Sequence, residues 1–214
     1  MRGHNRTAIS RDTGGIVRKI TGLLALFAAA TIFAAASAQA VVVIDFESLE
    51  TVNNTVDYVG DTYSEDGFEL TNLSPGVGIG AFGTLESRFT GSTALFDDNA
   101  DGLIRLNQIG DGPFDLLAIN LASLNGSVPV DVTFVGTLSG GGAVSQTFTI
   151  DGSPFVQQTF NFTGFSNLTK VEWVQAPPYH QFDNIVIDVV PEPDTWLLVG
   201  TAIGTAILLR KLLK

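Results

Sequence analysis

The chain has 214 residues, a formal net charge of −11 at pH 7 and no cysteine. Without cysteine, disulfide bonds, thiolate metal sites and thiol nucleophiles are excluded. Between residues 41 and 190 the basic residues are Arg88, Arg105 and Lys170, against nineteen Asp and Glu, so this part carries a net charge near −16. Such a charge repels phosphate backbones, and we therefore expect no nucleic-acid binding.

The first 40 residues have the pattern of a signal peptide. Five basic residues precede an apolar stretch at 23–33, and Ala38-Gln39-Ala40 follows. Signal peptidase accepts small residues at the first and third positions before the bond that it cuts. We therefore predict cleavage after Ala40, with Ala38 and Ala40 as the recognised residues; an uncleaved anchor helix is the alternative.

The C-terminal end has the pattern of a short membrane anchor. Residues 196–209 are apolar, and Arg210, Lys211 and Lys214 follow. A helix of this length is about 21 Å long, short of a hydrocarbon core of about 30 Å, but flanking leucines and snorkelling lysines extend its reach. We expect a transmembrane helix whose basic end stays on the cytoplasmic side.

Directly before this segment stand Pro191, Glu192 and Pro193. A Pro-Glu-Pro motif, an apolar helix and a basic end together resemble the PEP-CTERM sorting signal of Gram-negative bacteria. In that family an inner-membrane protease-transpeptidase, exosortase, recognises the tripeptide and releases the protein to the cell surface or extracellular matrix. The resemblance implies that Pro191, Glu192 and Pro193 are the sorting motif and that Arg210 with Lys211 is the retention signal. A plain anchor behind a proline-rich linker is the alternative.

Residues 41–190 are predicted to form one all-β domain. Short runs alternate apolar and polar residues and are broken by Gly, Asn, Asp and Pro. The expected strands are 41–46, 68–73, 93–96, 103–107, 116–121, 130–138, 144–150, 156–162, 171–174 and 182–190. Loops 139–142 and 151–154 are expected to join neighbouring strands as hairpins. About ten strands without helices predict two packed antiparallel sheets, a β-sandwich of jelly-roll type.

Two short motifs at the ends of this domain carry a second resemblance. Asp45-Phe46-Glu47 and Phe182-Asp183-Asn184-Ile185 are similar to the opening and closing strands of jelly-roll domains that precede such sorting tails. They are also similar to those of carbohydrate-binding modules of the same build. In those modules a structural calcium ion is held at such positions.

The residues themselves also suggest calcium. Period two places Asp45 and Glu47 on one strand face with Val43, and Asp183 on one face with Ile185. A carboxylate that faces a core is costly unless it is paired or bound to a metal, and basic partners are few. If the first and last strands are adjacent, we expect a structural Ca²⁺ held by Asp45, Glu47 and Asp183 with backbone carbonyls. Solvated strand ends are the alternative.

A second acidic motif spans residues 97–102. It reads D-x-N-x-D-G, the first half of a calcium loop, in which alternate oxygens converge. The second half is missing, because Gln108 stands where a bidentate Glu is required. An acidic hairpin turn is therefore the favoured interpretation.

Little points to catalysis. After signal removal His180 is the remaining histidine, and G-x-S-x-G, H-E-x-x-H and P-loop motifs are absent, so we expect no enzyme. Candidate rings for a sugar ligand are Trp173, Tyr58, Tyr63 and Tyr179; Tyr179, next to two prolines, is the favoured exposed ring, whereas Trp173 shares a face with Val171 and is expected in the core. Three functions stay open: a surface or matrix protein defined by its location, a carbohydrate-binding module for extracellular polysaccharide, and a minor glycan hydrolase with a carboxylate pair.

Overall fold

The structure is a computed structural model and describes residues 40–74, 76–99 and 101–189. They form thirteen strands and one 3-10 helix, η1 (Glu47–Leu49). The strands are β1 (Ala40–Ile44), β2 (Val56–Gly60), β3 (Thr62–Glu65), β4 (Phe68–Asn72), β5 (Ile79–Phe82), β6 (Leu95–Asp97), β7 (Gly102–Gln108), β8 (Phe114–Ser123), β9 (Val130–Leu138), β10 (Ala143–Ile150), β11 (Gln158–Asn161), β12 (Leu168–Gln175) and β13 (His180–Val189). In these ranges no helix is long and apolar enough to cross a membrane. The predicted signal peptide before Ala40, the sorting motif and the C-terminal helix lie outside them.

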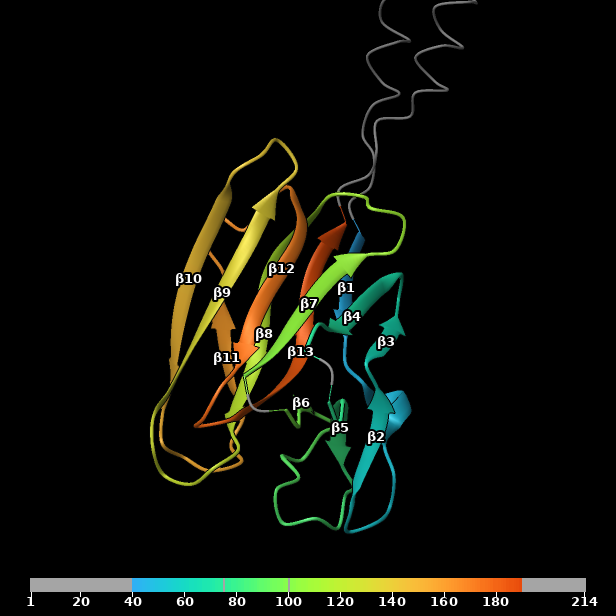
Figure 1. Cartoon of the computed structure of the whole chain (residues 1–214), viewed down its shortest axis with the longest axis vertical. Helices are drawn as coiled ribbons and strands as arrows, with labels where there is room; N and C mark the ends of the chain where they lie inside the picture. Colours follow the sequence, from blue (N-terminus) through green and yellow to red (C-terminus); the bar gives the residue numbers. More distant parts are fainter. Residues whose placement is uncertain (1–39, 75, 100, 190–214) are drawn as a thin grey trace, which may run out of the picture. The chain divides into compact units, whose positions relative to one another are not determined.

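The strands build two antiparallel layers that pack face to face (Figure 1). The front layer runs β10-β9-β12-β7-β4-β3, and the back layer contains β11, β8 and β13. The free edge of β13 pairs with β1 along one half and with β6 near its start; β5 and β2 extend from β6. The predicted all-β antiparallel sandwich is confirmed.

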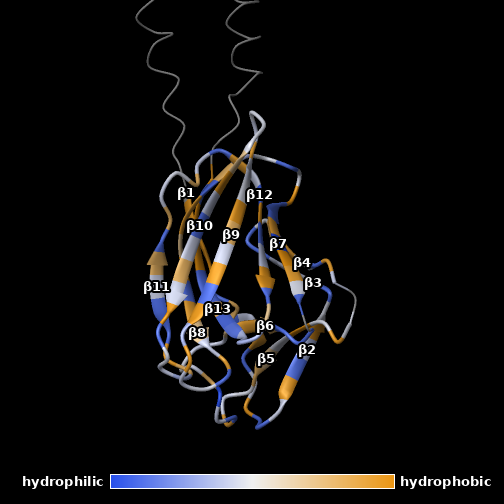
Figure 2. Cartoon of the chain, turned by 60° about the vertical axis from the view of Figure 1, so that its left-hand side comes forward, coloured by the Kyte–Doolittle hydropathy of each residue, from blue (hydrophilic) through white to orange (hydrophobic). Residues whose placement is uncertain are grey.

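The core lies between the inner faces of the two layers. In β9, Val130, Val132 and Phe134 are buried while Asp131 and Thr133 are exposed, which confirms the predicted alternation. Figure 2 shows the same alternation of hydrophobic and hydrophilic colour along the strands. Trp173 is 2% exposed in the centre of this core, as predicted.

The chain differs from the prediction in two respects. Strands β2, β3 and β5, which lie between residues 56 and 82, were not expected. The loop 139–142 joins β9 and β10 as a hairpin, as predicted, but β10 and β11 do not form the second hairpin, because β11 pairs with β8. The segment after β10 therefore carries the chain from the front layer to the back layer.

Candidate functional site

Strands β1 and β13 lie side by side, as the calcium hypothesis required. Ile44 pairs with Ile185 in their antiparallel ladder. Ile44 and Phe46 both face the core, at 1% and 0% exposure, and Phe46 has a left-handed backbone with φ 58°. The expectation that Asp45 and Glu47 face inward is wrong, because the neighbouring residues bring the larger apolar side chains and occupy the core face.

Glu47 and Asp183 meet at the segment before β6, whereas Asp45 lies apart. Oε1 of Glu47 accepts the backbone N–H of Thr93 at 3.1 Å, and the hydroxyl of Ser92 donates to Asp183. Burial raises the pKa of Asp183, and the charge of Glu47 adds to the increase. Oδ1 of Asp45 accepts the N–H of Glu47 at 3.1 Å instead. Throughout the part of the chain that the structure describes, no three His, Cys, Asp or Glu residues are arranged to hold a metal.

A β-bulge in β13 sets the direction of the Asp183 side chain, which is fully buried. The register with β8 shifts after Asp183, and Asn184 has a φ of 46°. Phe182 and Ile185 therefore both face the core, and Asp183 does not share their face as expected. Gln157 donates to the Asp183 carboxylate at 2.7 Å, and Asn184 donates to both of its oxygens. Protein donors thus satisfy this carboxylate.

The loop before β13 does not present a free ring. Tyr179 is half-buried and packs against a second apolar cluster of Phe82, Phe96 and Leu124. His180 is 1% exposed, and its burial lowers the pKa of the imidazole to about 3. A neutral histidine shielded from solvent is poorly placed to act as a general base.

The second cluster lies where β2, β5 and β6 extend from the back layer. We give the name aromatic platform to this cluster of Phe82, Phe96 and Leu124 together with Val56 and Tyr179, which pack against it, and the neighbouring Tyr58. Phe82 and Phe96 stack with centroids 4.5 Å apart and planes 14° apart. A Cβ at Gly80 would lie 2.8 Å from Val56 and 3.3 Å from both Phe96 and Tyr58, so the glycine leaves the space that these side chains fill.

Tyr58 gives the platform its access to solvent. It is 48% exposed, and no other aromatic residue in the described ranges is more than about a third exposed. Its hydroxyl donates to Oδ2 of Asp98, and this hydrogen bond raises the pKa of Tyr58. Beside it, the Arg88 guanidinium lies 4.2 Å from the centroid of the Phe82 ring and donates to Glu86 at 2.7 Å. The platform thus presents an exposed ring, carboxylates and a guanidinium together.

A shallow depression borders β2 and η1. It has a volume of about 310 Å³ and is lined by residues 48–51 of η1 and its flank together with Asp57, Tyr58, Val59 and Ala81. Asp57 pairs with Ala81 whereas Tyr58 pairs with Gly80, so the side chains of Asp57 and Tyr58 project to different faces of the strand. Thr51 and then Asn53 donate to Asp57 and lower its pKa. We take the platform as the candidate site because it combines the exposed Tyr58 ring with carboxylates and a guanidinium group.

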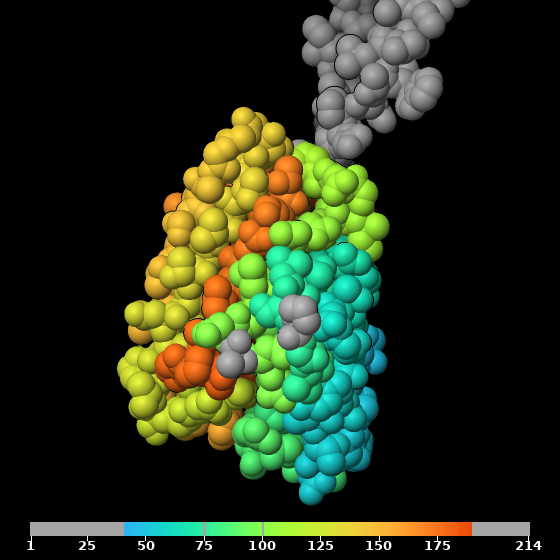
Figure 3. All heavy atoms as spheres, viewed as in Figure 1, coloured from blue at the N-terminus to red at the C-terminus, as the bar shows by residue number. Residues whose placement is uncertain are grey.

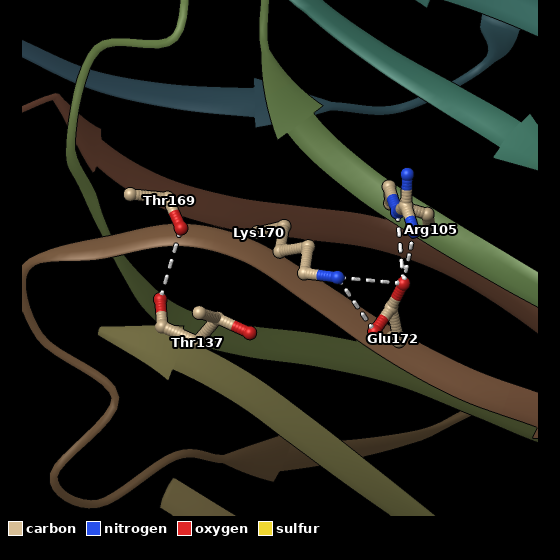
Figure 4. Close-up of polar contacts among 5 residues, drawn as sticks. All are labelled: Arg105, Thr137, Thr169, Lys170 and Glu172. Carbon is tan, nitrogen blue, oxygen red and sulfur yellow. Dashed lines mark hydrogen bonds and ion pairs between the residues drawn. The ribbon is translucent and has the colours of Figure 1, made fainter. Parts of the chain in front are cut away.

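A charged network occupies the outer face of the front layer (Figure 4). Glu172 Oε1 accepts from Nε and Nη2 of Arg105 at 2.8 and 2.6 Å, and Lys170 Nζ lies 3.1 Å from both carboxylate oxygens. The surface around it runs from β9 and β10 (yellow) across β12 (orange) to β7 (green) in Figure 3. With Arg88 bound to Glu86, each of the three basic side chains in the described residues is paired with a carboxylate.

Comparison with known proteins gave matches among solved structures alone. No protein-family model matches the chain, and no curated protein does. A mutant family 29 carbohydrate-binding module complexed with mannohexaose is 13% identical and matches over 71% of this chain and 93% of that one, with a TM-score of 0.41. A second mutant, complexed with cellulohexaose, is 14% identical over 63% of this chain and 90% of that one, with a TM-score of 0.36. This chain is thus similar, at TM-scores below 0.5, to carbohydrate-binding modules of family 29.

Proposed function

We propose that this chain is an exported protein of the bacterial cell surface or extracellular matrix, whose β-sandwich domain binds polysaccharide without catalysis. The signal peptide and the sorting tail that would place it there are read from the sequence. The observation that carries the binding function is the half-exposed Tyr58 ring on the aromatic platform. The acidic charge of the domain favours neutral glycans over those that carry uronic acids.

The platform has the chemistry that a sugar ring requires. The apolar C–H face of a pyranose packs on an aromatic ring, and its hydroxyls bond to nearby carboxylates and guanidinium groups. Tyr58 supplies the ring, Asp98 holds its hydroxyl, and Arg88 stands near with a half-exposed side chain. A ring that is fixed before binding loses little conformational freedom when the ligand arrives. A non-catalytic role agrees with the burial of His180, the one histidine in the described residues.

Affinity electrophoresis of the full-length chain against neutral and uronic-acid polysaccharides tests this proposal. We expect retardation by a neutral glycan, and about fivefold weaker binding in Tyr58→Ala, since stacking on a ring contributes about 1 kcal/mol. Tyr58→Phe keeps the ring and should bind nearly as the natural chain does. Val135→Ala, an exposed apolar change in the front layer, is the control. Binding that survives Tyr58→Ala, or no retardation by any glycan, would reject the proposal.

The sorting function has its own test in a host that contains exosortase. We expect Glu192→Ala to remain with the membrane fraction, whereas the natural chain and the control Glu50→Ala are released. Immunoblots of membrane and extracellular fractions measure this. Release of Glu192→Ala at the natural rate would contradict recognition of the Pro-Glu-Pro motif, and retention of the natural chain in the membrane fraction would favour a plain anchor.

A further inference from the structure

The Asp97 carboxylate at the end of β6 is only half satisfied. Asp97 is 1% exposed, and its Oδ1 accepts the backbone N–H of Asn99 at 3.1 Å and the side-chain amide of Asn99 at 2.6 Å. The Asn72 amide nitrogen lies between two carboxylates, 3.4 Å from Asp97 Oδ1 and 3.3 Å from Asp61 Oδ1. Oδ2 of Asp97 is buried and has no hydrogen-bond partner. Burial raises the pKa of Asp97 to about 6.

A second buried side chain without partners lies at the same place. Gln175 is 0% exposed, and neither its Oε1 nor its Nε2 has a hydrogen-bond partner. Gln175 pairs with Gly102 in the ladder between β12 and β7, and a Cβ at Gly102 would lie 1.9 Å from Asp97 Oδ2. Residues directly opposite in an antiparallel pair project on the same face. The Gln175 amide and Asp97 Oδ2 therefore share the buried side of β7 at Gly102.

Charge indicates what the two unpartnered groups would bind. Arg88, Arg105 and Lys170 are bound to Glu86 and Glu172, so no basic side chain of the described ranges is in contact with Asp97. A buried carboxylate that lacks a cation is costly, and carboxylate and amide oxygens are the ligands that calcium prefers. The sequence motif 97–102 does not itself form the site, because Asn99 Oδ1 accepts the N–H of Val77 at 2.8 Å.

We propose that a divalent cation of the calcium class binds between Asp97 Oδ2 and Gln175 Oε1, where β6, β7 and β12 meet. Asp61, across Asn72, adds negative charge next to this position. The site differs from the one predicted at Asp45, Glu47 and Asp183, and it does not depend on glycan binding. Three acidic groups are not required, since the amide oxygen of Gln175 takes the place of a carboxylate.

Calorimetric titration of the full-length chain with CaCl₂, and thermal unfolding in CaCl₂ or EDTA, test this site. We expect one calcium ion per chain and a higher melting temperature in calcium than in EDTA. Asp97→Asn removes the charge at constant shape, so it should melt above the natural chain in EDTA and gain nothing from calcium. Gln175→Glu adds a carboxylate ligand and should bind calcium about tenfold more tightly.

Two control variants separate this site from others. Asp111→Asn changes an exposed turn residue with a φ of 61° and should bind calcium as the natural chain does. Asp183→Asn should also leave calcium binding unchanged. Absence of calcium binding by the natural chain would overturn the proposal. So would binding that Asp183→Asn abolishes and Asp97→Asn preserves.

Discussion

The rings of Phe46 and Phe182 meet edge to face, with centroids 5.9 Å apart and planes 80° apart. Phe46 follows β1 and Phe182 lies near the start of β13, so this contact joins the two ends of the domain through its core. On its other side Phe182 meets Trp173 in the same manner, at 5.2 Å and 86°. The three rings form a continuous series of edge-to-face contacts between the layers.

We expect Phe46→Ala and Phe182→Ala each to lower the free energy of unfolding by about 3–5 kcal/mol, since both rings are fully buried. The double variant should lose about 0.5–1.5 kcal/mol less than the sum, which measures the edge-to-face contact. Urea denaturation followed by tryptophan fluorescence gives these values. Val128→Ala, 57% exposed, should change stability by less than about 0.5 kcal/mol. Full additivity would show that the two rings do not interact.

Substitution of Gly102 tests the close packing of the Asp97 carboxylate against the backbone of β7. A Cβ there would lie 1.9 Å from Asp97 Oδ2, so Gly102→Ala must displace a buried carboxylate. We expect a loss of about 1–3 kcal/mol, as for other overpacked sites. Gly140→Ala is the matched change, because nothing lies within 4 Å of a Cβ at that position. Equal urea midpoints for the two variants would argue against the packing of Asp97 on Gly102.

The strands that sequence reasoning located best are those with one buried and one solvated face. Strand β9 was predicted at its exact bounds, because Val and Phe alternate with Asp and Thr over residues 130–134 and a glycine-rich turn follows the strand. Strands β2 and β3 lack a fully buried face, since each of their residues is intermediate or exposed. Strand β5 is buried on both faces and contains glycine and alanine, which local propensity does not favour in strands.

The site depends on backbone features that period two does not contain. The bulge at Asn184 turns Asp183 away from the core face. In β1, the apolar side chains that fill the core decide which residues face inward. Tyr58 was a sugar-binding candidate by residue type, but its exposure depends on Gly80 and Asp98, which pair with it across other strands and loops. Such contacts come from tertiary structure and have no local signal.

The Glu172 network predicts a salt-dependent contribution to stability. Partial burial acts to raise the pKa of Glu172, but hydrogen bonds from Arg105 and Lys170 outweigh burial, and the pKa is lowered. Its contribution is therefore present above the unfolded pKa and is lost as the pH falls through the folded pKa. We expect Glu172→Gln to cost about 1 kcal/mol at pH 7 and less in 1 M NaCl. Glu69→Gln, which changes a carboxylate bonded to Thr71, is the control. A cost independent of salt would contradict an electrostatic origin.

Two buried groups, His180 and Asp97, should give opposite pH dependences. The folded state keeps His180 neutral down to about pH 3, whereas the unfolded chain takes up a proton below about pH 6.5, so stability falls as pH decreases in that range. The folded state keeps Asp97 protonated up to about pH 6, whereas the unfolded chain releases that proton above about pH 4, so stability falls as pH increases between these values. In the natural chain the two effects cancel between about pH 4 and 6.

Removal of either group should therefore reveal the pH dependence of stability that the remaining group causes. Relative to the natural chain in EDTA, His180→Gln should lose about 1.4 kcal/mol of stability for each unit of pH increase between pH 4 and 6. Asp97→Asn should gain a similar amount over the same interval. Urea denaturation at pH 4.5, 5.0, 5.5 and 6.0 measures both slopes, and all other titrating groups cancel in the differences. If neither variant's difference in unfolding free energy changes with pH, neither group is shielded from solvent in the folded domain. Slopes of the same sign for the two variants would contradict one of the two assignments.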